Sequence, residues 1–137
     1  MDCIFCKIVS NEIPSIKAYE DDRVLAFMDI NPLNEGHLLI VPKAHAATIH
    51  EIAEADFLAV MSVTHKLAAA VKKVLNPEGI NLLQLNGKAA NQVVPHLHVH
   101  IVPRWSGDGL TICKWEPFEG DMGKIKDVAE KIRRAVK

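Results

Sequence analysis

Three histidines alternate with apolar residues in the stretch His96-Leu97-His98-Val99-His100. Alternate side chains of an extended strand point to the same face, so we expect the three imidazoles on one face and the apolar residues on the other, buried face. A neutral imidazole is a good nucleophile near neutral pH, and a second imidazole roughly 7 Å along the same face can donate to phosphate oxygens. Phosphoryl chemistry is therefore one interpretation of this stretch.

Other interpretations compete with it. A solvent-exposed polar face is disfavoured, because three histidines in strict register are unusual at a surface. One metal shared by all three is also disfavoured, because the outer pair lies about 13 Å apart along a regular strand and a metal needs each nitrogen within about 2.1 Å. Two adjacent histidines can still meet around one ion, so a zinc hydrolase that activates water with an H-x-H pair remains an alternative.

Cysteines supply a second candidate site. Cys3 and Cys6 form a C-x-x-C pair, for which a redox role, a metal role and coincidence all compete. The pair stands at the start of the chain with Ile4 and Phe5 between its members, which argues against a thioredoxin-like motif. Cys113 is expected as a lone thiol that is at least partly buried.

Length and composition restrict the class of protein. The chain has 137 residues, of which 49% are hydrophobic and 24% charged, and these values fit one globular domain. The formal net charge of -1 argues against a protein that coats nucleic acid or a membrane surface, since both need a basic excess. We see no export signal and no apolar run of the ~20 residues that span a bilayer, so we expect a cytoplasmic protein.

The hydrophobic pattern indicates which elements hold these residues. Short strands are expected at 16–20, 24–29, 37–41 and 80–86, in addition to the histidine strand. Apolar residues at three- and four-residue spacing predict a long helix over 53–75 and an amphipathic helix over 122–136. Strands come mostly before and after the one long helix, which predicts an α+β fold with a mainly antiparallel sheet.

Taken together, the motifs resemble the histidine triad (HIT) family, and most closely its Hint-like bacterial branch. The segment from Asn86 to Arg104 matches the family signature, and shorter motifs precede it in the family's order. These motifs are Ile4–Ile8, Glu12–Pro14, Tyr19–Asp22, Leu25–Ile30 and His37–Lys43. The resemblance implies the HIT fold over one domain, 1–137. Its motif-bearing part is about 2–105, and 106–137 is a C-terminal extension with the amphipathic helix.

The resemblance also implies an activity. HIT proteins hydrolyse or transfer nucleoside monophosphates through a covalent nucleotidyl-histidine intermediate. The family's nucleophile corresponds to His98, which would attack the α-phosphorus of a purine nucleotide conjugate such as a phosphoramidate, an acyl-adenylate or a dinucleoside polyphosphate. A hydrogen bond from its other ring nitrogen to a backbone carbonyl would fix the tautomer. His100 would stabilise charge on the phosphoryl oxygens.

Further positions match family residues that bind the nucleotide. His37 corresponds to a histidine that lines the phosphate site, and Asp29 to the acidic residue that holds the ribose hydroxyls. Asn86 and Gln92 correspond to polar contacts near ribose and phosphate. The family packs the base against residues that here are Phe5, Ile13 and Phe27.

The resemblance implies a metal and a partner as well. Some bacterial HIT proteins bind a structural zinc ion with a C-x-x-C pair, a histidine after Pro-Lys and the first triad histidine, which here are Cys3, Cys6, His45 and His96. Such a closed site has no open position for water, so no catalytic metal is expected. The family also implies a homodimer, with the long helix and part of the sheet at the interface.

One position departs from the pattern. Much of the Hint branch has a hydroxyl residue after the glutamine, placed to help the leaving group, and Val93 stands there. Asn91 likewise replaces a common glycine, although asparagine tolerates left-handed backbone. These departures put efficient phosphoramidate cleavage in question, and a nucleotide-binding or partner-binding module with weak catalysis is a second alternative.

Overall fold

The computed structural model describes residues 2–112 and 114–136, so Cys113 lies outside the described residues. The helices and strands are, in chain order, α1 (Ile4–Val9), β1 (Lys17–Glu20), β2 (Val24–Met28), β3 (Leu38–Pro42), α2 (Glu54–Leu75), β4 (Gly79–Gln84), the short 3-10 helix η1 (Lys88–Ala90), β5 (Val99–Arg104) and α3 (Met122–Ala135).

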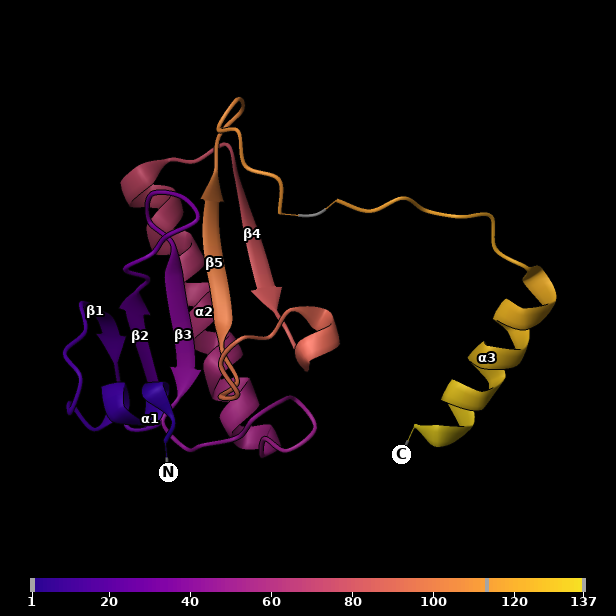
Figure 1. The fold of residues 1–137 in the computed structure, drawn as a ribbon, viewed down its shortest axis with the longest axis horizontal. Helices are drawn as coiled ribbons and strands as arrows, with labels where there is room; N and C mark the ends of the chain where they lie inside the picture. The colour runs from indigo at the N-terminus through magenta and orange to yellow at the C-terminus, as the bar shows by residue number, and fades with distance from the viewer. Residues whose placement is uncertain (1, 113, 137) are drawn as a thin grey trace.

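The five strands form one antiparallel sheet in the order β1-β2-β3-β5-β4 (Figure 1). The predicted α+β class with a mainly antiparallel sheet is therefore confirmed. β5 lies between β3 and β4, and its His100 pairs in register with Leu39 on one side and Leu83 on the other. This central place holds the end of the histidine stretch rigidly.

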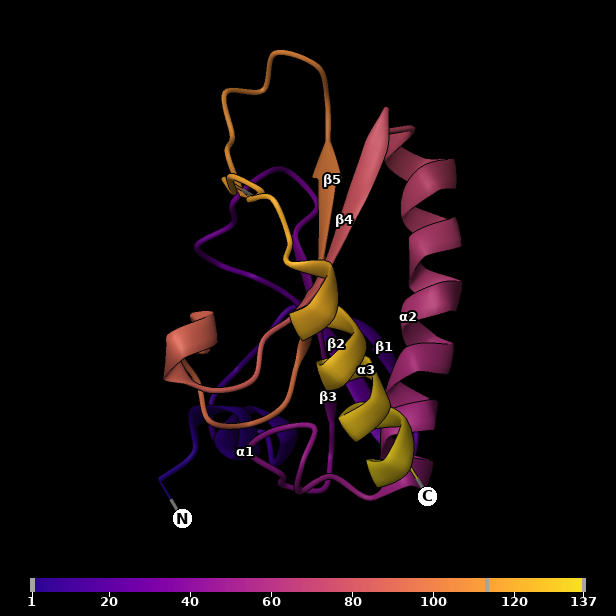
Figure 2. The same cartoon turned by 90° about the vertical axis from the view of Figure 1, so that its right-hand side faces the viewer.

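Helices cover the two faces of the sheet unequally. The long α2 packs along one face, while the short α1 lies on the other side (Figure 2). Alternate residues of β2 face the two sides, so that Val24 and Ala26 join the core under α2 and Leu25 and Phe27 join a second cluster beside α1. Because both faces are buried, the central strands read as continuous apolar runs.

The predicted long helix is confirmed almost to the residue. α2 runs over Glu54–Leu75, and its buried residues are Val60, Val63, Thr64 and Val71, which recur at helical spacing. Asn76 ends the helix in the left-handed conformation with φ of 46°, as asparagine does at a helix C-terminus, and Pro77 follows.

α1 was not predicted. It has six residues, too few to show helical periodicity, and Cys3 caps its N-terminus by accepting a hydrogen bond at Sγ from the backbone N–H of Cys6. Only Phe5 and Ile8 of this helix are buried. Packing against the sheet, rather than propensity, stabilises so short a helix.

The histidine stretch differs from the expected regular strand. β5 begins only at Val99, and the N–H of Leu97 donates to the carbonyl oxygen of Ala46 instead of a sheet partner. His96 and His98 are buried, as are Leu97 and Val99. The apolar residues are buried as expected, and His96 and His98 are buried as well because both sides of this segment are covered.

The C-terminal helix extends away from the sheet (Figure 1). α3 begins after Asp121, which caps it by accepting a hydrogen bond from Lys124 N–H, so the helix predicted over 122–136 is confirmed. None of its residues is buried, and Ile125, Val128 and Ile132 are exposed along one side. Within the described residues, every helix is too short or too polar to cross a bilayer.

Candidate functional site

His98 is buried at the start of β5 with one ring nitrogen tied to the backbone. Its Nδ1 lies 2.7 Å from the carbonyl oxygen of His96, which can only accept, so Nδ1 carries the proton and Nε2 holds a free lone pair. The expected tautomer is therefore confirmed. The ring of Phe5 meets His98 edge-on at 5.0 Å between centroids. Burial lowers the pKa of His98, which keeps the imidazole neutral and able to attack.

His37 and His100 form a directed chain of hydrogen bonds beside it. The backbone N–H of Leu33 donates to His37 Nδ1 at 3.0 Å, so the His37 proton resides on Nε2. That Nε2 lies 2.9 Å from His100 Nδ1 and donates to it, which leaves the His100 proton on its own Nε2. The rings of His98 and His100 are 4.8 Å apart between centroids. The ring of His98, with a lone pair on Nε2, and the ring of His100, with a donor on Nε2, therefore lie side by side.

Burial keeps this chain uncharged. It lowers the pKa of His37, and it lowers the pKa of His100 to about 4, with further lowering from His98 and His37. Asp29 opposes both shifts, since its Oδ2 lies 3.7 Å from His37 Nε2. At neutral pH the pair is neutral, so the N–H of His100 acts as a hydrogen-bond donor without a full charge.

A cavity of about 200 Å³ adjoins Asp29. The three residues expected to pack the base, Phe5, Ile13 and Phe27, all line it together with Asp29. Asp29 Oδ1 accepts a hydrogen bond from Asn31 N–H at 2.8 Å, which fixes the carboxylate at the cavity wall. An apolar slot with a carboxylate at its rim fits a base and a vicinal diol.

Asn86 and Gln92 have backbone partners. Gln92 Nε2 donates to the carbonyl oxygens of Ala47 (2.7 Å) and Val94 (3.0 Å), while its Oε1 accepts from Gly87 N–H. Asn86 Oδ1 accepts from Ile49 N–H at 2.7 Å. The two amides thus shape the loop in front of His98, and a direct contact of either with ribose or phosphate stays a prediction.

Val93 lies on the same loop and is 89% exposed. It lines a surface cavity with Thr48, Lys88 and Gln92. The neighbouring Asn91 has φ of 68°, so the tolerance of asparagine for left-handed backbone is used here. The departure in the sequence therefore faces solvent, and its effect on the leaving group stays a prediction.

The four residues expected to bind zinc come together. The Nδ1 atoms of His45 and His96 are 3.2 Å apart, and the thiols of Cys3 and Cys6 lie 3.4 and 3.6 Å from His96 Nδ1. Tetrahedral zinc requires about 3.3 Å between two nitrogens and about 3.6 Å between sulfur and nitrogen. His96 Nε2 donates to the Pro42 carbonyl oxygen at 2.8 Å, so Nδ1 turns its lone pair to the thiols. The donor set therefore fits zinc.

The other histidines do not form a comparable site with their neighbours in sequence. Among the described residues, His98 belongs to no group whose ligand atoms lie within 4.8 Å of one another, whereas Asp29, His37 and His100 form one such group. In that group the hydrogen bond from Leu33 N–H and the one between the two rings already engage both nitrogens of His37 and Nδ1 of His100. An H-x-H zinc site gains no support from this geometry.

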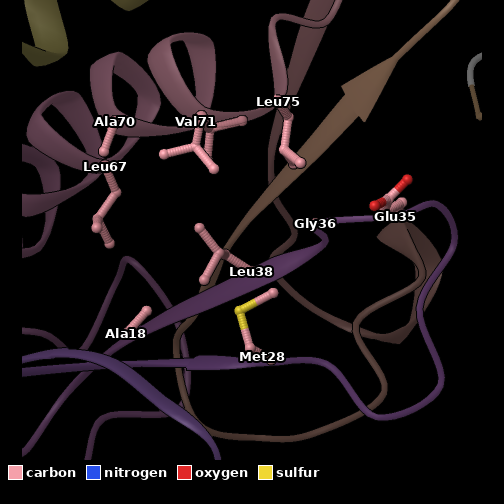
Figure 3. Close-up of a pocket in the computed structure, with 10 residues that line it drawn as sticks. Ala18, Met28, Glu35, Gly36, Leu38, Leu67, Ala70, Val71 and Leu75 are labelled. Carbon is pink, nitrogen blue, oxygen red and sulfur yellow. The ribbon is translucent and has the colours of Figure 1, made fainter.

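A separate apolar cavity of about 400 Å³ lies between α2 and the strands β1 to β3. Met28, Leu38, Leu67 and Val71 point into it (Figure 3). Glu35 is the one ionisable residue among those that line it, so the cavity lacks the groups that phosphoryl chemistry requires. The groups that phosphoryl chemistry requires gather at the histidines instead.

Comparison with known proteins identifies the family of this chain. The model of the HIT domain matches residues 10–107, well over half of the chain. The chain belongs to the HIT family. Across 100% of both chains, this HIT protein is 39% identical to adenosine 5′-monophosphoramidase hnt1 of Schizosaccharomyces pombe.

Solved structures show the same fold. A HIT family protein from Bacillus anthracis superposes with a TM-score of 0.93 at 40% identity, covering 99% of this chain and 98% of the other. A zinc-bound histidine triad family protein from Mycobacterium smegmatis superposes with a TM-score of 0.77 at 33% identity, covering 99% of each chain. A zinc-bound relative is consistent with the fit of the Cys/His cluster to a metal.

Proposed function

We propose that this HIT protein is a nucleotide hydrolase or transferase that acts on the α-phosphorus of a purine nucleoside monophosphate conjugate. The observation that carries the proposal is the arrangement at His98, where the bond from Nδ1 to the His96 carbonyl directs an unprotonated Nε2 beside the donor of His100. The name of the fission yeast relative points to an adenosine 5′-phosphoramidate as the substrate to test first.

The reaction proceeds in two displacements. The lone pair of His98 Nε2 forms a bond to phosphorus while the bond to the leaving group breaks, and the leaving group departs with that electron pair. Water then attacks phosphorus, the P–N bond breaks, and its electrons return to Nε2 as the nucleoside monophosphate leaves. The Nε2–H of His100 stabilises the charge that develops on the phosphoryl oxygens.

The surrounding residues bind and orient the nucleotide. Phe5, Ile13 and Phe27 pack against the base in the cavity that they line, and Asp29 accepts hydrogen bonds from the ribose hydroxyls. His37 acts through His100, because it donates to His100 Nδ1 and thereby holds the outer proton in place. Asn86 and Gln92 stabilise the conformation of their loop through hydrogen bonds to backbone groups, and this loop faces the phosphate.

Zinc has a structural role in this proposal. Cys3, Cys6, His45 and His96 would hold it, and when bound it supplies a cross-link between α1 and the histidine stretch. All four ligand positions belong to the protein, so the ion has no open position at which to activate water. The phosphoryl step therefore belongs to His98 and His100 alone.

We also infer a homodimer of single-domain chains in the cytoplasm, with α2 and part of the sheet at the interface and 106–137 as an extension of the domain. Leu58 and Val74 of α2 and Leu82 of β4 are exposed apolar residues, which supports an association of copies at this surface. Light scattering after size-exclusion chromatography measures the mass in solution, and a monomer at tens of micromolar would contradict the dimer.

The test of the activity compares wild type with His98→Ala on adenosine phosphoramidate, an aminoacyl-adenylate and a dinucleoside polyphosphate. We expect His98→Ala to abolish turnover and to prevent the nucleotidyl adduct that intact-protein mass spectrometry detects after rapid quenching. His65→Ala, at an exposed position of α2, serves as the matched histidine control. Undiminished turnover in His98→Ala would refute the nucleophile. Tight monophosphate binding without turnover in wild type would identify a binding module.

A further inference from the structure

A buried hydroxyl at the wall of the base cavity has no hydrogen-bond partner. Ser15 lines the cavity of about 200 Å³, and its Oγ is inaccessible to solvent, yet no described residue donates to it or accepts from it. The other lining side chains are mostly apolar, among them Phe5, Ile13 and Phe27. Asp29 differs from Ser15, because its carboxylate already accepts Asn31 N–H.

The backbone fixes Ser15 at this wall. Met28 N–H donates to the carbonyl oxygen of Ile16 at 2.8 Å, and Lys17 pairs with Phe27, so the segment before β1 runs antiparallel to the end of β2. Continuing this register places Ser15 beside Asp29 at the edge of the sheet. Ser15 therefore cannot leave the cavity without breaking the pairing of these two strands.

An unpaired buried hydroxyl is exceptional. Nearly all buried polar groups in folded proteins have a partner, because burial removes the hydrogen bonds that water provides. A valine or alanine in the same place would avoid this cost. Rotation of the Ser15 side chain about χ1 would turn Oγ from its buried position toward the cavity, where a ligand with a polar edge would supply the missing partner.

We propose that Ser15 is a specificity-determining residue whose Oγ hydrogen-bonds to the polar edge of the nucleobase. The inference rests on the proposed function, since it assumes that a purine nucleotide occupies this cavity. A hydroxyl both donates and accepts, so Ser15 selects a base with a ring nitrogen or an exocyclic group at that edge and rejects an analogue that lacks it. The apolar walls, by contrast, contact the faces of any base.

Binding measurements test the proposal without requiring turnover. Isothermal titration calorimetry on the zinc-loaded full chain compares AMP with 1-deaza-AMP, 7-deaza-AMP and purine riboside 5′-monophosphate, each of which lacks one polar atom or group of the base. We expect Ser15→Ala to raise the Kd of AMP about 5- to 10-fold, the effect of one hydrogen bond. In wild type, at least one analogue should have a Kd about 5- to 10-fold above that of AMP. The Kd of that analogue should be no higher in Ser15→Ala than in wild type.

Two variants and one further ligand make the outcome decisive. Ser15→Thr keeps the hydroxyl and should retain the discrimination, while Ser10→Ala removes an exposed serine whose Oγ bonds to the Lys7 carbonyl and should change nothing. Ser15→Ala should also raise the melting temperature of the ligand-free protein, because it removes an unpaired polar group. If wild type and Ser15→Ala bind 2′-deoxy-AMP with the same Kd, the partner of Ser15 is the ribose and the proposal is overturned.

The remaining outcomes separate this inference from the function on which it rests. Wild type and Ser15→Ala could both bind AMP and discriminate equally among the analogues. That outcome would overturn the role of Ser15 and would not affect the assignment of the nucleotide site. Failure of wild type to bind AMP at all would overturn the nucleotide site and Ser15 with it.

Discussion

Removal of the metal should destabilise the protein and leave the chemical step intact. The four ligand atoms of Cys3, Cys6, His45 and His96 already stand near tetrahedral spacing, so binding requires little reorganisation and its free energy adds to stability. Zinc at 100 times its Kd contributes about 2.7 kcal/mol. With roughly 2.1 cal/mol/K of unfolding entropy per residue, a chain of 137 residues loses about 9 °C in Tm when that zinc is removed.

Calorimetric melting with and without a zinc chelator measures this shift, and metal analysis should give one zinc per chain. Cys6→Ser should melt at the lower temperature with or without chelator, whereas His65→Asn, at an exposed position of α2, should behave as wild type does. Equal melting of wild type with and without chelator, or the same chelator shift in Cys6→Ser, would refute the assignment of the ligands.

Turnover after metal removal separates a structural zinc from a catalytic one. Phe5 lies between the two cysteines on α1 and contacts both Phe27 and His98, so a loosened α1 should weaken the base cavity. Well below the melting temperature we therefore expect KM to rise with kcat nearly unchanged. A kcat that falls in proportion to the bound metal would instead support the zinc hydrolase.

Three further predictions concern the loop, the histidine chain and one glycine. Val93→Ser should raise kcat on a phosphoramidate about 2- to 10-fold over both wild type and Val93→Ala, because a hydroxyl can donate to the leaving group. His100 has a folded pKa of about 4 against 6.5 unfolded, so its contribution to stability is complete above pH 6.5 and is lost as pH falls toward 4. Melting temperature plotted against pH should therefore fall less steeply in His100→Asn than in wild type, and a parallel curve would contradict this. Gly36→Ala should lower the free energy of unfolding in urea melts by about 1–3 kcal/mol, because φ is +82° and a Cβ would lie 2.4 Å from Leu75. As a control, a Cβ at Gly79 meets no atom, so Gly79→Ala should change the free energy of unfolding by less than about 0.5 kcal/mol.

Periodicity predicted those elements that are long enough to repeat. α2 repeats its apolar residues over six turns and ends at Asn76, so both its type and its end were visible in the sequence. α1 has only six residues and depends on packing of Phe5 and on the cap from Cys3. The packing of Phe5 is not local to the helix, and cysteine is not among the residues that usually cap a helix N-terminus, which is why α1 was missed.

Alternation misled at the histidines for a related reason. A period of two indicates an extended chain, but it does not say what pairs with the backbone. Leu97 N–H donates to the Ala46 carbonyl oxygen and the chain bends at His96, so the segment of His96 and His98 lies outside the sheet. Burial on both sides follows from α1, which the sequence did not reveal.

The assignment of separate tasks to the histidines follows from one structural device. In His96, His98 and His37 a backbone group binds one ring nitrogen and leaves the other free to act, and in His100 the ring of His37 takes the place of the backbone group. The Pro42 carbonyl turns the Nδ1 lone pair of His96 to the cysteines, and the His96 carbonyl in turn directs the Nε2 lone pair of His98 toward the substrate. Leu33 N–H donates to His37 Nδ1, so the proton of His37 lies on Nε2 and is donated to His100 Nδ1. The proton of His100 is therefore on its Nε2, which points away from His37. One carbonyl, that of His96, belongs to a metal ligand and also sets the nucleophile, so the metal centre and the active site share one residue. The hydrogen bond to the Pro42 carbonyl holds the His96 ring without the metal, which is why the chemical step should survive zinc removal.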